Sequence, residues 1–132
     1  MIVLASIREP QHHRGTVFNI ATGEMKGVPR LEFLIPGWKI VRDHQRGKIT
    51  NDQYIYGYRD SETNQAVPGY RQILQSRWPA VSTWLKSLEA QIDLTLVCFC
   101  KEYENGKSKF CHRQYIKAVI ECYRLDLEVI LH

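Results

Sequence analysis

The chain has 132 residues, of which 44% are hydrophobic and 24% charged, and its formal net charge is +4. This length is typical of one domain. With this apolar fraction, a chain of this size can bury about two-thirds of the surface that its unfolded form exposes. The composition therefore argues against an intrinsically disordered chain. No apolar run approaches the ~18 residues of a membrane-spanning helix, so we expect no membrane partner.

The positive charge is concentrated in residues 1–50, which carry eight Lys or Arg against four Asp or Glu. Such a bias can favour a phosphate-bearing partner, including nucleic acid, but the charges are scattered, so a solvated face is the preferred interpretation. All four cysteines fall in the last third, unlike those of a disulfide-stapled secreted protein. The N-terminal residues do not resemble a signal peptide, and we expect a cytoplasmic protein with reduced thiols.

Two short strands are predicted near the N-terminus. Ile2–Ile7 is a β-branched apolar run, typical of a strand buried on both faces, and Thr16–Ala21 is predicted to be the second strand. The segment between them is too short for a helical crossover. Either these two strands run antiparallel or a loop replaces the crossover helix.

Two helices are predicted in the following part of the chain. The first covers Trp38–Arg46 and ends at a glycine. The second starts at Thr50, which can form a capping box with Gln53. In this second helix we expect Tyr54 and Tyr58 to share one face, since they are four residues apart.

The second half of the chain is predicted to alternate between helices and strands. In chain order the expected elements are a helix over Pro68–Gln75, a helix opened by Trp78-Pro79, a strand at Leu94–Phe99, a loop at Lys101–Lys109, a helix over Cys111–Tyr123 and a strand at Leu127–Leu131. The helix over Cys111–Tyr123 is expected to turn one apolar stripe to the core, formed by Tyr115, Ala118, Val119 and Cys122. This order of elements predicts an α/β fold. We expect a single domain over residues 1–132, a small Rossmann-like three-layer domain with a short, mainly parallel sheet.

Chemically useful side chains are predicted to converge where the strand Leu94–Phe99 ends and the next helix starts. Cys98 lies at the strand end, and Cys111, His112 and Arg113 open the helix. In parallel sheets ligands bind beyond the carboxyl ends of the strands, where helix N-termini offer free N–H groups to anions. We therefore expect an anion-binding pocket at this edge of the sheet.

Each residue of this group has an expected role. Cys111 is a candidate nucleophile whose thiolate is favoured by the helix start, and His112 is a candidate proton carrier. Arg113 is a candidate anion clamp, and Cys98 is expected to line the floor of the pocket. Two strand-end residues, Ser6 and Asn19, are further candidates for the pocket wall. The competing interpretation is that these cysteines are buried packing residues and that the strand-end polar groups make ordinary hydrogen bonds.

Two features of the spacing argue against a metal centre, and we expect neither a metal nor another cofactor. Cys98 and Cys100 are separated by one residue instead of the two to four that are usual for zinc ligands. Cys111 and His112 are adjacent at a helix start, where neighbouring side chains diverge by ~100°. A structural zinc module is therefore the least favoured of the functional interpretations.

The segments Leu96-Val-Cys-Phe and Phe110-Cys-His-Arg resemble the domain-of-unknown-function family numbered 488. In that family a strand ending in a cysteine is followed by a loop and by Cys-His-Arg at a helix start. Further similar segments are Leu4-Ala-Ser, Phe18-Asn-Ile-Ala, Leu34-Ile-Pro-Gly-Trp, Gly47-Lys-Ile-Thr and Tyr54. The resemblance implies a Rossmann-like fold with a pocket at the strand ends, and it implies no known substrate.

The chain departs from that family pattern at three positions that are polar or acidic in many members. Asn19 and Ala21 stand where many members carry Asp and Arg, and Cys100 stands where an acid usually follows the strand cysteine, with Glu102 two residues later. We expect a pocket-bearing domain that binds or processes a nucleotide-like or other anionic small ligand. The alternative is a non-enzymatic interaction protein that retains the fold, with a role related to nucleic acid or host defence.

Overall fold

The structure is a computed structural model, and it describes residues 1–100 and 111–132. The strands are β1 (Ile2–Ser6), β2 (Thr16–Asn19), β3 (Tyr58–Arg59), β4 (Ala66–Val67), β5 (Leu94–Cys98) and β6 (Val129–Leu131). The helices are α1 (Trp38–Gln45), α2 (Asn51–Tyr56), α3 (Tyr70–Ser76), α4 (Trp78–Ser87) and α5 (His112–Tyr123), with 3-10 turns η1 (Pro10–His12) and η2 (Glu32–Leu34). The loop predicted at Lys101–Lys109 lies outside the described residues. Within the described part, no helix is long and apolar enough to cross a membrane.

Four strands form a parallel sheet in the order β2-β5-β1-β6, which confirms the predicted α/β class. The sheet is that of a small Rossmann-like domain, and a separate antiparallel pair is formed by β3 and β4. The question left open for the first two strands is answered, because β1 and β2 both run parallel to β5. They are not neighbours, since β5 lies between them, and η1 takes the place of a crossover helix.

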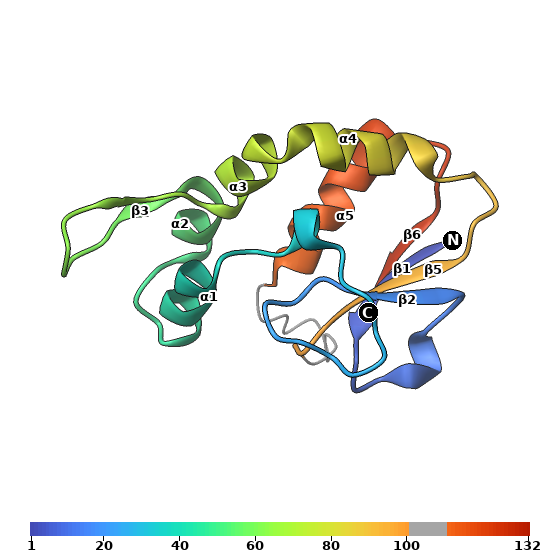
Figure 1. Cartoon of the computed structure of the whole chain (residues 1–132), viewed down its shortest axis with the longest axis horizontal. Coiled ribbons are helices and arrows are strands. Elements are labelled where there is room, and N and C mark those ends of the chain that lie inside the picture. Colours follow the sequence, from blue (N-terminus) through green and yellow to red (C-terminus); the bar gives the residue numbers. More distant parts are fainter. Residues whose placement is uncertain (101–110) are drawn as a thin grey trace.

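The two central strands carry the core. Every residue of β1 and β5 is buried, whereas the edge strands β2 and β6 are partly exposed. Apolar runs with no polar alternation suit strands that are covered on both faces. The register pairs Ser6 with Cys98, so β1 and β5 end at the same edge of the sheet. Figure 1 shows α1 and α2 beyond this edge, where α5 also begins.

The predicted capping box at the start of α2 is confirmed. The Gln53 backbone N–H donates to Thr50 Oγ1, and the Thr50 backbone N–H donates to Gln53 Oε1. The predicted pairing of Tyr54 with Tyr58 on one helix face is wrong, because α2 ends at Gly57. That glycine adopts φ +93°, a region that favours glycine, and Tyr58 already belongs to β3.

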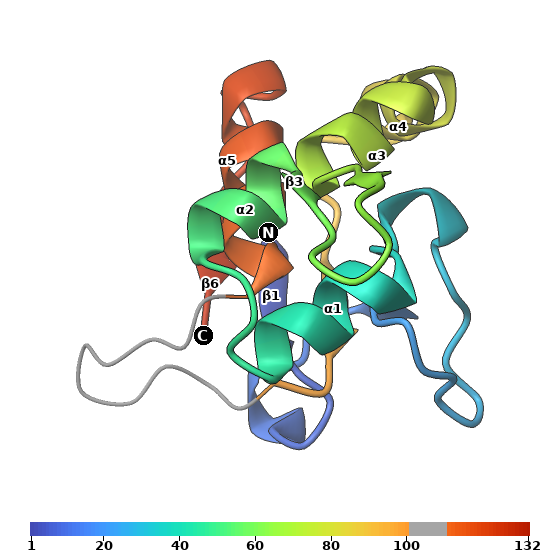
Figure 2. The same cartoon turned by 90° about the vertical axis from the view of Figure 1, so that its left-hand side faces the viewer.

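The predicted inner stripe of α5 is also wrong. The residues that α5 buries are His112, Arg113, Ile116 and Ile120. The predicted stripe instead lines an open groove beside α3, at Tyr115, Ala118, Val119 and Cys122. Residues of α3 also line this groove, and Figure 2 shows α3 and α5 at the same end of the molecule. The face against the sheet is chosen by contact of α5 with β1 and β6.

Candidate functional site: three cysteines and a histidine at the strand ends

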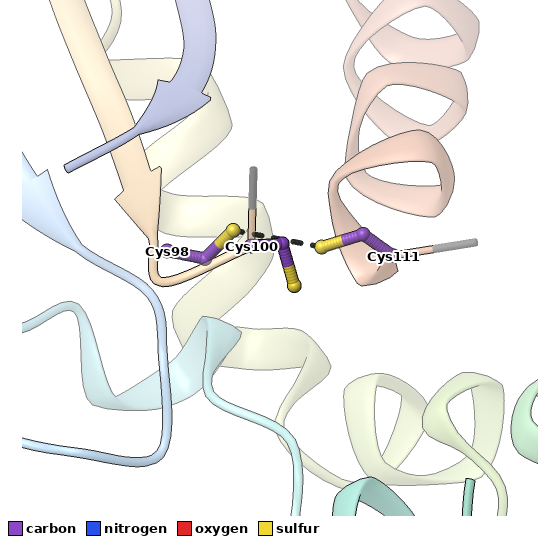
Figure 3. A group of neighbouring side chains, drawn as sticks. All are labelled: Cys98, Cys100 and Cys111. Atoms are coloured by element: carbon purple, nitrogen blue, oxygen red, sulfur yellow. Dashed lines mark hydrogen bonds between the residues drawn. The ribbon is translucent and has the colours of Figure 1, made fainter. Parts of the chain in front are cut away.

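The end of β5 and the start of α5 bring Cys98 and Cys111 together. Their sulfur atoms lie 3.6 Å apart although thirteen residues separate them in sequence. Cys98 is 1% exposed and Cys111 4% exposed, and they pack with Ala21 and Met25 in a small apolar cluster. Figure 3 shows the two sulfurs facing each other, one from the strand end and one from the helix start.

Local backbone structure explains how the two sulfurs come to face each other. Cys98 is the last residue of a central strand, and hydrogen bonds of the parallel ladder hold its backbone opposite Ser6. Cys111 is the N-cap residue of α5 and has an extended backbone, while its carbonyl oxygen accepts from the Gln114 N–H. The first helical turn therefore leaves the Cys111 side chain outside the helix and directed at the strand end.

His112 contacts the Cys111 sulfur through a defined ring nitrogen. Its Nε2 lies 2.8 Å from the carbonyl oxygen of Ile20, which only accepts, so Nε2 carries the proton. Nδ1 lies 3.5 Å from Cys111 Sγ and, in the neutral ring, offers its lone pair to the thiol. The ring of Tyr70 packs edge-on against His112, with 5.5 Å between ring centroids. The ring is thus held on two sides with its basic nitrogen toward the sulfur.

The protons of the thiol cluster are distributed unequally. Hydrogen bonding with Cys100 and Cys98 holds the pKa of Cys111 well below its ordinary value, although burial of this thiol acts to raise it. The pKa of Cys98 is raised by its hydrogen bonds with Cys100 and Cys111 and by burial, and that of Cys100 is raised mainly by its hydrogen bond with Cys111. The positive charge of the Arg113 guanidinium acts to lower the pKa of both Cys98 and Cys100 and so offsets part of the increase. Of the three thiols, Cys111 is therefore the one that loses its proton most readily.

Cys100 completes a group of three sulfurs that all lie within 4.8 Å of one another. Figure 3 shows Cys100 beside the line that joins Cys98 and Cys111. In the structure, neither of the two spacings that argued against a metal keeps the side chains apart. β5 ends at Cys98, so Cys100 lies past the strand and can approach the other sulfurs. The side chains of Cys111 and His112 do not diverge, as their 3.5 Å contact shows.

A cavity of about 100 Å³ opens beside these residues. Its described lining includes Cys98, Cys100, Cys111 and His112 together with side chains from α1 and α2, and the residues from those two helices are Val41, His44, Gln45 and Tyr54. The predicted pocket at the strand ends is therefore present as a cavity. The contributions of α1 and α2 were missed, because nothing local to those segments indicates that they cover the sheet edge.

The other predicted site residues do not belong to the described lining of this cavity. Arg113 is fully buried and donates from Nη1 to the His132 carbonyl oxygen at 3.1 Å, which joins α5 to the end of β6. Ser6 is fully buried, and its Oγ accepts from the Arg8 N–H. Asn19 donates to the Gly23 carbonyl oxygen and accepts from the Ala21 N–H, both at 2.8 Å. These last two residues shape the turns that follow β1 and β2.

Comparison of the chain with protein-family models, with curated proteins and with solved structures finds no match. The resemblance to the family numbered 488 thus stays a prediction that depends on the motif residues alone.

Proposed function

We propose that the cavity beside Cys111 binds a small anionic ligand, with Cys111 and His112 as the reacting pair. The observation that carries this proposal is the 3.5 Å contact between Cys111 Sγ and His112 Nδ1 at the wall of the cavity. A thiol next to the basic nitrogen of an oriented imidazole is the arrangement of a cysteine nucleophile. The sulfur would attack an electrophilic atom of the ligand, and the imidazole would pass the thiol proton to the leaving group.

Apart from the three cysteines, the surroundings of the cavity favour an anion. The N–H groups of the first turn of α5 start at its wall, and such N–H groups stabilise negative charge. Two histidines, His44 and His112, belong to the described lining, and none of the described lining residues is Asp or Glu. A ligand with a phosphate or carboxylate group therefore meets hydrogen-bond donors and no opposing carboxylate.

The size of the cavity narrows the ligand class. A volume of about 100 Å³ is smaller than the ~300–1,000 Å³ of sites for drug-sized molecules. The space accommodates one phosphate or carboxylate group and a few attached atoms. A nucleotide would place only its phosphate there. We therefore propose a small anion as the ligand, with a nucleotide-like molecule as the larger variant of the same chemistry.

Two alkylating reagents of nearly the same shape test the proposal, namely anionic iodoacetate and neutral iodoacetamide. Labelling of each cysteine is followed by peptide mass spectrometry, with the exposed Cys122 as the internal reference. We expect Cys111 to favour iodoacetate over iodoacetamide about two- to fivefold more than Cys122 does, which corresponds to 0.3–1 kcal/mol from a helix terminus. A Cys111 that stays unlabelled until the protein unfolds would show that it is a packing residue.

The alternative, a non-enzymatic interaction protein that retains the fold, is favoured by one observation. Two of the predicted polar site residues, Ser6 and Asn19, use their side chains in hydrogen bonds to nearby backbone groups. Under this alternative the polar side chains at the strand ends stabilise the fold and do not bind a ligand. Cys111 should then show no preference between the two reagents beyond that of Cys122.

A further inference from the structure

We infer that the sulfurs of Cys98, Cys100 and Cys111 together bind one Zn²⁺ ion. Among the described residues these are the metal-ligating side chains whose ligand atoms all lie within 4.8 Å of one another. Thiolate sulfur is a preferred zinc ligand, and three protein ligands are the set typical of zinc sites that keep one position open. This inference goes beyond the proposed function and uses the same Cys111 sulfur, so the reaction of Cys111 with an alkylating reagent is a property of the metal-free protein.

The spacing of the sulfurs fits a zinc ion closely. Zn–S bonds of about 2.3 Å in a tetrahedral site place the sulfurs about 3.8 Å apart. Cys98 and Cys111 already lie at 3.6 Å, and the limit of 4.8 Å for the group leaves at most about 1 Å of adjustment. Cys100 is exposed and lies past the end of β5, so it can make that adjustment without disturbing the sheet.

The surroundings also balance the charge that such a site creates. Three thiolates and one Zn²⁺ carry a net charge of −1. Each bound thiol gives up its proton to solvent as its S–Zn bond forms. Arg113 is fully buried at the start of α5, and the first-turn N–H groups of that helix lie beside Cys111. Both features stabilise negative charge at this end of the helix.

The position of His112 leaves the fourth coordination site open. Its Nε2 is committed to the Ile20 carbonyl oxygen, and its ring nitrogens are not part of the group within 4.8 Å. The fourth position is thus left to water or to the anion of the proposed function, and only this last step depends on that proposal. Exposed Cys100 and the adjacent cavity provide a route for the ion to two sulfurs that are themselves buried.

Metal titration of the full chain tests the inference. The protein is freed of metal with a chelator under reducing conditions and titrated with Zn²⁺ in competition with a chromophoric chelator. We expect one zinc per chain in the wild type and in Cys122→Ser, whose substituted residue lies on the exposed side of α5. Cys98→Ser and Cys100→Ser should each weaken binding by more than about tenfold, since loss of even an outer-shell partner costs that much. Because Cys100 is exposed, Cys100→Ser should keep the wild-type circular dichroism.

Cobalt provides a readout of the ligands themselves. Co²⁺ in the wild-type site should give the charge-transfer absorption of cobalt–thiolate bonds and the visible bands of a tetrahedral ion, both reduced in Cys100→Ser. The inference is overturned by less than one zinc per chain in the wild type, or by equal affinity in wild type and Cys100→Ser. Failure of the proposed function is distinguishable. It would appear as absent reagent preference at Cys111 in metal-free protein, whatever the zinc titration gives.

Discussion

Cys111 and His112 form a thiol–imidazole pair whose tautomer is set from outside the pair. The proton of His112 resides on Nε2 because this nitrogen donates to the Ile20 carbonyl oxygen, which leaves Nδ1 facing Cys111 Sγ at 3.5 Å. Ile20 directly follows β2, so the strand that borders β5 orients the imidazole beside the thiol of the adjoining helix. The contact between the adjacent residues Cys111 and His112 thus depends on the hydrogen bond from His112 to Ile20, which is distant in sequence.

The first prediction concerns this pair. His112→Gln places an amide near the position of Nε2, so it can still donate to Ile20, but it removes the basic nitrogen that faces Cys111. We expect the rate of Cys111 alkylation in metal-free protein at neutral pH to fall by at least about tenfold. His44→Gln, at the other histidine of the cavity lining, is the matched control and should leave the rate with neutral iodoacetamide within about twofold. Equal rates in wild type and His112→Gln would contradict a role of the imidazole.

The second prediction tests which face of α5 is buried. Ile116 is 1% exposed in the core, whereas Val119 is half-buried beside the groove along α3. Ile116→Ala should lower the free energy of unfolding by about 2–5 kcal/mol, because it leaves a cavity between α5 and the sheet. Val119→Ala should cost about 1 kcal/mol or less. Urea unfolding of both variants measures the difference. A larger loss of stability in Val119→Ala than in Ile116→Ala would show that α5 buries the stripe that the sequence predicts.

Much of the fold could be predicted because its signals are local. The buried strands are continuous apolar runs, and the capping box of Thr50 and Gln53 is complete within four residues. The errors arose where a choice depended on distant contacts. Two apolar faces are present on α5, and only contact with β1 and β6 selects the face that carries Ile116. The sequence pattern predicts a helix that continues through Gly57 to Tyr58. A single glycine in such a pattern does not reveal that its φ is +93°, which ends the helix.

The site was predictable to the level of its elements and no further. A cysteine at a strand end and Cys-His-Arg at a helix start are visible in sequence, and the general rule for parallel sheets places them at one edge. The hydrogen bond from His112 to Ile20 and the approach of Cys100 to the other sulfurs depend on where the strands end, within one residue. A pattern of apolar residues does not locate the end of a strand to within one residue.

The third prediction concerns the dependence of stability on pH. Asp43 is buried at the end of the molecule that carries α1 and the β3–β4 hairpin. The Tyr58 hydroxyl, at 2.5 Å, and the Lys39 ammonium, at 2.9 Å, hold the pKa of Asp43 below its ordinary value of 3.8. A lowered carboxyl pKa contributes stability above the unfolded-state value, and this contribution is lost as the pH falls through the folded-state value. Acidification below about pH 4 should therefore remove it.

Tyr58→Phe isolates this contribution. At neutral pH we expect the variant to unfold with a free energy about 1.5–3 kcal/mol lower than the wild type, the value of a hydrogen bond to a charged group. The difference should narrow as the pH is lowered below the ordinary pKa of the carboxyl, and urea unfolding at a series of pH values measures it. Tyr56→Phe, an exposed tyrosine of α2, is the control and should be neutral at every pH. A difference that stays constant down to pH 3 would exclude Asp43 as its source.

The fourth prediction separates two roles of Arg113. The sequence suggests a clamp that touches the anion, whereas the structure directs Nη1 to the His132 carbonyl oxygen and buries the guanidinium completely. Arg113→Lys keeps the positive charge but loses the planar fork of donors, and Arg113→Met removes both. If the residue acts through its charge, Arg113→Lys should retain the preference of Cys111 for iodoacetate and Arg113→Met should reduce it.

Both Arg113 variants should be less stable than the wild type, by about 1–3 kcal/mol, because the partly buried His132 carbonyl oxygen loses its donor. The labelling measurement is therefore made under conditions where circular dichroism shows that each variant is folded. A direct clamp predicts a different outcome, in which Arg113→Lys and Arg113→Met lose the iodoacetate preference to the same extent. Since the described lining of the cavity excludes Arg113, we expect the lysine variant to behave like the wild type in labelling and unlike it in unfolding. That combination would assign Arg113 to the support of the thiol cluster and of the contact between α5 and β6, and not to contact with the ligand.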